Sequence, residues 1–320
     1  TTANWYGYDT DGVTAKTASA LMAYFVEGGT VYANTDYDAA VLRLKNTDID
    51  FGYIAAGGTR NAALLSRLAG LGIESNTQFA FDIDGSLSPE AAIAFMASLN
   101  LDTMYAQAYW APLKTDDPLN GGKDYLGTSA INVGKRCLRN ANTNADGIAP
   151  KNWVIAGKDN PLQRTGIVQT YTPSENQLNA LADAKINPVL FTRYNDGSKY
   201  VFVDSLTSAK TTGNKKLIAV AEMSSTLDDW IAKYANECLQ FPMEESIDRM
   251  TKFMEKLLPA AETAKWIKPS TDATSEIYGK SFAFEVAPNK QRPDDRMDVR
   301  YWTHYDGTNR ATYVQQTHSK

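Results

Sequence analysis

Two aspartates that lie two residues apart, Asp82 and Asp84, could act together in catalysis. The segment FAFDIDG, residues 79–85, is apolar up to Asp82, continues through Ile83 to Asp84 and Gly85, and leads into a helical pattern. An aspartate at the end of a buried strand can act as a nucleophile toward a phosphoryl group, with the second acid close by. The same residues can instead end a strand and turn the chain.

The catalytic alternative is a magnesium-dependent phosphatase of the haloacid dehalogenase kind, with Asp82 as the nucleophile and Asp84 as the second acid. Such an enzyme also needs a later pair of acids at a strand end to hold magnesium. The downstream pairs are Asp116-Asp117, Asp228-Asp229 and Asp294-Asp295. None of these pairs ends a buried apolar strand. In the structural alternative, Asp84 and Gly85 turn the chain and Ser88 caps the next helix, which demands less of the sequence.

The composition of the chain argues against several further classes of function. The chain has 320 residues, 43% hydrophobic and 22% charged, which is typical of globular protein and long enough for two domains. A net charge of -5 argues against nucleic-acid binding. No apolar run approaches the roughly 18 residues of a membrane span, so we expect no membrane insertion. With histidine only at His304 and His318, and cysteine only at Cys137 and Cys238, we expect no metal, no cofactor and no catalytic residues.

The elements that position Asp82 and Asp84 follow a regular order. Predicted strands cover 50–58, 77–84 and 102–110, and predicted helices cover 61–72 and 88–99. Strands that alternate with helices pair in parallel through right-handed crossovers, so the fold class is α/β with a mostly parallel, doubly wound sheet. Two weaker helices are predicted over 17–27 and 36–45, and a short helix over 129–138. The basic residues in and just after this helix, Lys135, Arg136 and Arg139, are typical of a solvated face, with contact charges in an assembly as the alternative.

The second half of the chain changes in character after residue 211. Before that point we predict a short strand over 153–157, a helix with a capping box of Thr172, Pro173 and Glu175, and a hairpin around Asn195 to Ser198. Residues 211–216 look like a linker. Beyond them we predict two amphipathic helices separated by Pro242, then strands over 281–286, 298–305 and 310–316. The predicted domains are therefore residues 1–213, a non-catalytic α/β core, and residues 214–320, a smaller α+β domain.

Several segments in this order resemble one protein family. They are GYIAAGG, FAFDIDG, AQAYWAPLKTDDP, APKNWVIAG, TPSENQLNALADAKINPVLFTRYNDGSKYVF, LDDWIAKYANECLQFPMEESIDRMTKFMEKLL and FAFEVAPNKQRPDDRMDVRYW. From about residue 50 to the end, the chain is similar to the tail sheath proteins of contractile-tailed bacteriophages. It departs from them at YLGTSAINVG, where the family has a Pro-Pro-Ser-Gly stretch. The resemblance implies a core with subtilisin-like topology but without a protease triad.

The resemblance also implies a function. Sheath subunits polymerise as stacked hexameric rings around the tail tube protein and contract to drive the tube through the host envelope. We therefore expect a structural protein of the virion tail, found in the host cytoplasm before assembly, whose partners are its own copies and the tube. Contraction of this kind needs two packings of one rigid subunit.

The last strands are the candidate contact surface between subunits. An exposed sheet edge can accept a strand from a neighbour, and the strand pair over 298–316 could form such an edge or could form an internal hairpin. The interface residues that we select are Arg300, Trp302, Arg310, Tyr313 and Gln315. The chain begins at Thr1 rather than Met, so we also expect a fragment or a processed product. If Thr1 and Lys320 are truncation points, we expect the isolated fragment to be a monomer.

Overall fold

The structure, a computed structural model, describes residues 33–117 and 121–310. The chain divides into two compact units, residues 1–44 and 45–320. The described part of the first unit lies in helix α3 (Asn34–Lys45). This helix confirms the one predicted over 36–45, whereas the helix predicted over 17–27 lies outside the described residues.

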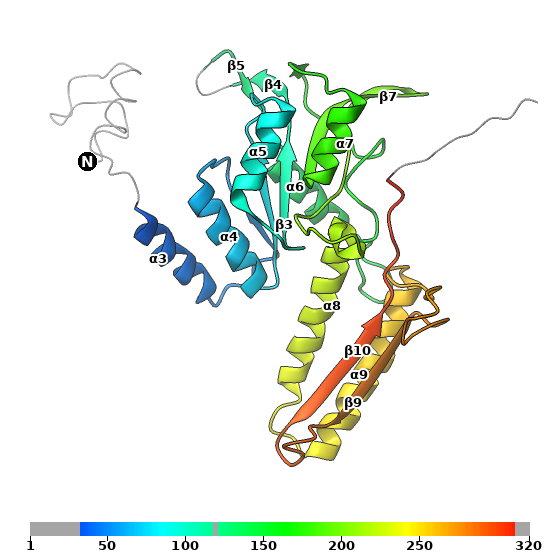
Figure 1. Cartoon of the computed structure of the whole chain (residues 1–320). Helices are drawn as coiled ribbons and strands as arrows, with labels where there is room; N and C mark the ends of the chain where they lie inside the picture. Colours follow the sequence, from blue (N-terminus) through cyan, green and yellow to red (C-terminus); the bar gives the residue numbers. More distant parts are fainter. Residues whose placement is uncertain (1–32, 118–120, 311–320) are drawn as a thin grey trace, which may run out of the picture. The chain divides into compact units, whose positions relative to one another are not determined.

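A five-stranded sheet forms the centre of the second unit (Figure 1). In spatial order its strands are β1 (Tyr53–Ala55), β2 (Gln78–Ile83), β3 (Ala106–Trp110), β7 (Ile186–Tyr194) and β8 (Gly197–Phe202). The first four strands are parallel, and β8 pairs antiparallel with β7 across the predicted hairpin. Every residue of β3 is buried, as expected for a strand covered on both faces.

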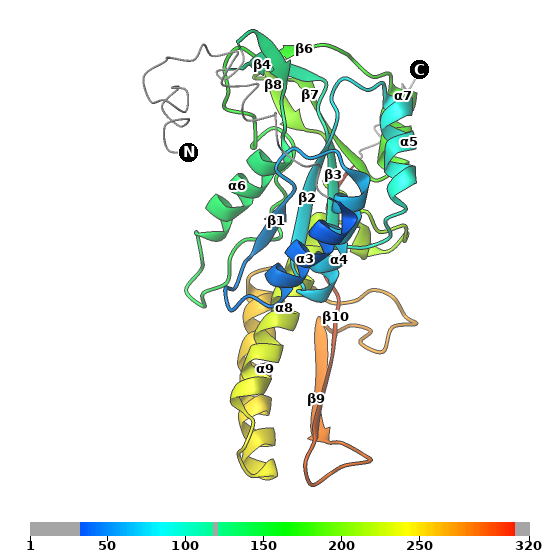
Figure 2. The same cartoon turned by 90° about the vertical axis from the view of Figure 1, so that its left-hand side faces the viewer.

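Helices cover both faces of this sheet (Figure 2). On one face lie α4 (Ala62–Glu74), α5 (Pro89–Leu99) and α7 (Glu175–Asp183), and on the other lie α6 (Ser129–Asn140) and the first turns of α8 (Ile218–Glu237). The predicted α/β fold class is therefore confirmed. The described strands follow one another across the sheet in chain order, without the reversal at which α/β sheets usually bind ligands.

Local start signals place the helices that follow the first strands. Ser88 accepts a hydrogen bond from the Ala91 amide at 3.2 Å, and Pro89 is the first helical residue of α5, as predicted. For α7 the predicted capping box is wrong by two residues. The cap is Ser174, whose hydroxyl accepts from the Gln177 amide at 3.3 Å while the Gln177 carboxamide oxygen accepts from the Ser174 amide at 2.9 Å.

A small three-stranded sheet interrupts the region between β3 and β7. It consists of β4 (Leu113–Asp116), β5 (Lys123–Tyr125) and β6 (Val168–Gln169), all antiparallel. These residues carry no strand signal in the sequence, because the strands are short and their burial is uneven. Gly121 and Gly122, both with positive φ, lie between β4 and β5.

The strand predicted over 153–157 is not formed. Ile155 is buried against the sheet, and its carbonyl accepts a hydrogen bond from the Asn132 carboxamide at 3.2 Å. The Gly157 amide donates to the Phe202 carbonyl at 2.9 Å. The apolar pattern of the segment therefore reflects burial of an irregular loop, whose backbone groups are satisfied one at a time rather than by a neighbouring strand.

The C-terminal part is built from two helices and a strand pair. α8 and α9 (Met243–Thr263) pack together with β9 (Phe282–Pro288) and β10 (Met297–Thr303), which pair antiparallel (Figure 1). Met250, Met254 and Trp266 are fully buried in this cluster, so these side chains belong to the core. A 3-10 turn, η1 (Asn214–Lys216), precedes α8. The domain boundary at residues 213 and 214 stays a prediction.

Among the described glycines, Gly85 is the one at which an added Cβ would lie nearest to a backbone atom, and this gives a first prediction. A Cβ atom at Gly85 would lie 2.0 Å from the Ala111 carbonyl oxygen, whereas a Cβ at Gly134, on α6, would meet nothing within 4 Å. We expect Gly85→Ala to lower the free energy of unfolding by about 3 kcal/mol and Gly134→Ala to raise it by about 0.5 kcal/mol, both measured by urea denaturation. Equal effects of the two substitutions would contradict this packing.

Candidate functional site

Asp82 holds the start of a helix rather than an open catalytic position. It lies at the carboxyl end of β2, where its carboxylate accepts hydrogen bonds from the Thr128 amide at 2.7 Å, the Ser129 amide at 2.8 Å and the Ser129 hydroxyl at 2.5 Å. Thr128 itself makes no side-chain capping bond. Burial raises the pKa of the Asp82 carboxyl, and the hydrogen bonds from Ser129 and Thr128 act in the opposite direction. Asp82 thus supplies the cap that α6 lacks.

Asp84 turns the chain, as the structural alternative predicts. Its carboxylate accepts a hydrogen bond from the Ser86 amide at 2.9 Å and forms an ion pair with Arg60 at 2.6 Å. This is the side-chain-to-backbone turn that aspartate favours before glycine. Both acids of the motif are therefore occupied by structural partners.

The later acids that a phosphatase would need do not join Asp82. Asp228 accepts from the Tyr301 hydroxyl, Asp229 pairs with Lys233 at 2.9 Å, and Asp295 pairs with Arg292. Among residues 33–117 and 121–310, no three histidine, cysteine, aspartate or glutamate side chains are grouped so that they could hold a metal ion. In the same residues, no helix is long and apolar enough to cross a membrane.

A buried ionic cluster, consisting of Glu222, Arg136, Arg139 and Tyr53, joins α8 to α6 and β1. Glu222 is 2% exposed; its carboxylate accepts from the Tyr53 hydroxyl at 2.5 Å and from the Arg139 guanidinium at 2.9 Å. A second ion pair joins Arg136 to Glu222, with 3.8 Å between Arg136 Nη1 and Glu222 Oε1. Arg136 also donates to the Tyr109 hydroxyl at 2.6 Å.

The charges in this cluster shift the pKa values of the groups beside them. Burial by itself would raise the pKa of Glu222, but the positive charges of Arg136 and Arg139 outweigh burial and hold that pKa below its ordinary value. Burial, followed by the nearby Glu222 charge, raises the pKa of the Tyr53 hydroxyl, so Tyr53 stays protonated and donates. At neutral pH the cluster therefore consists of one carboxylate, two guanidinium groups and a neutral Tyr53 hydroxyl that donates to the carboxylate.

This cluster corrects the expectation of a solvated basic face on residues 135–139. Arg136 is 1% exposed, and the Arg139 side chain is 8% exposed. The helical spacing of Asn132 and Arg136 places both on the face of α6 that packs on the sheet. The signal that could have revealed the cluster is Glu222, a single acid in the otherwise apolar start of a helix, which requires a buried positive partner.

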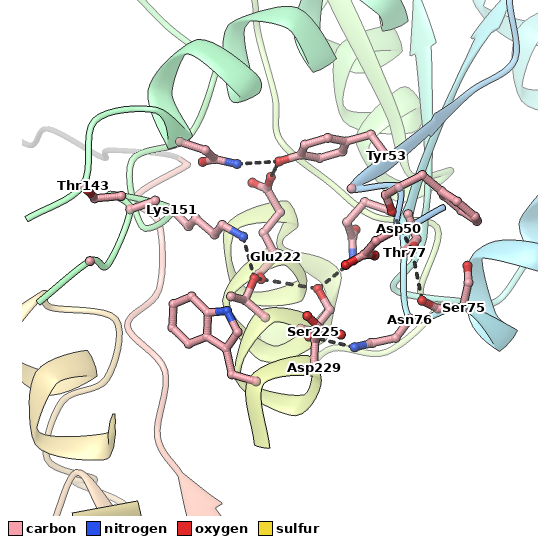
Figure 3. Close-up of a pocket in the computed structure, with 18 residues that line it drawn as sticks. Asp50, Tyr53, Ser75, Asn76, Thr77, Thr143, Lys151, Glu222, Ser225 and Asp229 are labelled. Carbon is pink, nitrogen blue, oxygen red and sulfur yellow. Dashed lines mark hydrogen bonds between the residues drawn. The ribbon is translucent and has the colours of Figure 1, made fainter. Parts of the chain in front are cut away.

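A polar groove lies beside the ionic cluster (Figure 3). Its cavity volume is about 470 Å³, and it is lined by residues before and at the starts of β1 and β2, by the loop over 140–151 and by α8. Glu222 and Lys151 both face it. The groove is therefore at the amino ends of the parallel strands, whereas Asp82 ends β2 at the carboxyl side, where enzymes with such sheets place their catalytic groups.

The predicted interface residues fall into three groups. Arg300 and Trp302 lie on β10, in register with Glu285 and Ala283 of β9, so β10 forms a hairpin with β9. Arg310 is occupied within the chain, because its guanidinium donates to both oxygens of Asp204. Tyr313 and Gln315 lie outside the described residues, as does nearly all of the strand predicted over 310–316. The interface itself stays a prediction.

The fold and the strand-end acids define a class: an α/β protein whose central sheet is accompanied by a helical pair and a two-stranded sheet, with its acids in structural positions. No protein-family model and no curated protein sequence matches the chain. Comparison of structures does find relatives in fold.

One similar chain comes from the PVC sheath complex of an extracellular contractile injection system in its contracted state. The TM-score is 0.66 at 12% identity, over 94% of this chain and 85% of that one. A second comes from the six-fold symmetrised baseplate of the anti-feeding prophage, with a TM-score of 0.66 at 14% identity, over 96% of this chain and 82% of that one. The resemblance to contractile sheath proteins is thereby confirmed at the level of the fold.

Removal of the Asp82 carboxylate gives a second prediction. We expect Asp82→Ala to lower the free energy of unfolding by about 2 kcal/mol, because the Thr128 and Ser129 donors lose their partner. The control is Asp84→Ala, which removes the partly exposed ion pair with Arg60 and the hydrogen bond from the Ser86 amide, and should cost about 1 kcal/mol. Chemical denaturation checks both values, and an Asp82→Ala variant as stable as the unaltered chain would contradict the capping role.

The lowered pKa of Glu222 gives a third prediction, for pH dependence. Because this pKa is depressed on folding, the stabilisation is fully present above the unfolded value of about 4.3 and is lost as the pH falls through the folded value. We expect Glu222→Gln to lower stability by about 3 kcal/mol at pH 7, and the difference to shrink below about pH 4. Glu237→Gln, at an exposed position of α8, is the matched control. Urea denaturation at several pH values measures both, and a difference independent of pH would contradict the assignment.

Proposed function

We propose that this chain is a structural subunit of a contractile sheath, which polymerises around a tail tube and contracts to drive the tube through a host envelope. The observation that carries the proposal is the fold similarity to a sheath-complex chain over 94% of this chain. That likeness extends through both the α/β sheet and the C-terminal helices and strands, so it covers the whole combination rather than a common sheet motif alone.

The site supports a scaffold role. Asp82 and Asp84, the two residues best placed for catalysis, are held by helix and turn donors. A protein that works through its surfaces needs a subunit whose parts are firmly connected, and the ionic cluster around Glu222 connects α8 with α6 and β1. We further propose the bacteriophage virion tail as its location, with the host cytoplasm before assembly, and stacked hexameric rings as the assembled form.

The hairpin of β9 and β10 is the proposed contact surface. Among the described strands these two pair only with each other, so each has an edge that a strand from a neighbouring copy can extend. Val299 and Tyr301 pack into the C-terminal core, and alternation then places Arg300 and Trp302 on the opposite face of β10. That face is available to a neighbour in the assembled sheath.

The contact surface gives a fourth prediction. In the full-length gene product, we expect Arg300→Glu to reduce assembly at least tenfold while leaving the melting temperature within about 2 °C, because the side chain is exposed. Lys290→Glu, an equally exposed position in the loop between β9 and β10, is the control. Electron microscopy for striated tubes and sedimentation of the assembled fraction measure the effect.

Two results would contradict the proposal as a whole. One is a full-length product that stays monomeric under all conditions, with no tubes or rings. The other is magnesium-dependent phosphatase turnover that Asp82→Asn abolishes, since a structural cap would not support such activity.

A further inference from the structure

The groove at the amino ends of β1 and β2 carries an uneven set of charges. Three carboxylates line it, and each already has partners within the chain. Lys233 Nζ lies 2.6 Å from an Asp50 oxygen and 2.9 Å from an Asp229 oxygen. Glu222 is held by Arg139 and Tyr53. Each carboxylate of the lining therefore has a cation beside it before any ligand arrives, with Asp50 and Asp229 sharing the single charge of Lys233.

Lys151 differs from the carboxylates of this lining, because it has no partner of opposite charge among the described residues. Its ammonium donates to the Thr226 hydroxyl at 2.5 Å, and among the described residues it forms no ion pair. An ammonium has three donors, and the side chain extends from the 140–151 loop into the hollow (Figure 3). Burial lowers the pKa of Lys151, and the Glu222 charge opposes that effect. A largely buried cation with donors to spare faces a space large enough for a ligand.

We propose that this groove is a carboxylate-binding subsite in which Lys151 is the anchoring cation. The lining decides the class of ligand. A cationic ligand would have to compete with Lys233 and Arg139 for carboxylates that they already bind. A singly charged carboxylate is neutralised by the single positive charge of Lys151. A doubly charged phosphate would be attracted by Lys151 and repelled by the carboxylates in the same proportion, and one of its charges would stay uncompensated in a largely buried site.

The carboxylate can come from two sources. One is an acidic side chain of another copy of this chain, which carries an excess of acids, 37 against 32 basic residues; this source rests on the proposed function. The other is a small free carboxylate. Both present the same group to Lys151, so the experiment has one arm for each.

The variants are Lys151→Met, which keeps the length of the side chain and removes its charge, and Lys151→Arg, which keeps a positive charge. Lys158→Met is the control, because Lys158 is an exposed lysine paired with Asp196 at 3.3 Å. Without ligand we expect Lys151→Met to melt at the same temperature as the unaltered chain or higher, since it removes a buried charge.

The first arm uses sodium acetate against sodium chloride at equal ionic strength. We expect acetate to raise the melting temperature of the unaltered chain by about 2 °C and to leave that of Lys151→Met unchanged. In the unaltered chain, the backbone amide resonances of Ser225 and Thr226 should shift with acetate and reach saturation. The second arm measures assembly of the full-length product, in which we expect Lys151→Met to reduce the assembled fraction at least tenfold and both Lys151→Arg and Lys158→Met to retain it.

A Lys151-dependent effect of acetate supports the subsite with a free ligand, and a Lys151-dependent loss of assembly supports it with a neighbour's acid. If acetate shifts nothing and Lys151→Met assembles like the unaltered product, the subsite is overturned. If the unaltered product does not assemble at all, the proposed function fails, and the acetate arm still decides the subsite.

Discussion

The attraction between Glu222 and the two arginines of α6 is the interaction on which the rest of the structure depends. α8 begins against the parallel sheet and continues into the C-terminal core, where it packs on α9 and the hairpin of β9 and β10. A charge buried to this extent is tolerated only when it is paired and hydrogen-bonded, and Arg139 and Tyr53 satisfy both conditions. The ionic cluster thereby fixes the direction in which α8 leaves the sheet, and with it the place of every later element.

The strand-end acids illustrate how one pattern serves chemistry in some proteins and architecture in others. A carboxylate after a buried strand is close to the amino end of a following helix, and that position favours a bound anion or a nucleophile. Here Asp82 itself is the anion at the start of α6, because Thr128 offers no side-chain cap. Asp84 then turns the chain beside Gly85, whose lack of a Cβ lets it approach the Ala111 carbonyl.

The sequence predicted those parts whose signals are local. The apolar strand before Asp82, the cap at Ser88 and the break at Pro242 each act over a few residues, and the elements that they predict are present. The misses depend on distant partners. Burial against the sheet gives the segment around Ile155 the apolar pattern of a strand, although in the described part of the chain this segment joins no strand ladder. Arg136 looked solvated because the acid that holds it, Glu222, lies far along the chain and joins it only after folding. The groove combines four segments that are distant in the sequence, so no local pattern could predict it.

The ionic cluster makes α8 and the sheet one cooperative body. Native-state hydrogen exchange can test this, because it measures the free energy of opening for each amide. We expect amides of α8 near Glu222 to open only together with those of β2 and β3, at the same free energy. If the first turns of α8 exchange through a separate opening of much lower free energy while the sheet stays protected, the ionic cluster does not join α8 to the sheet.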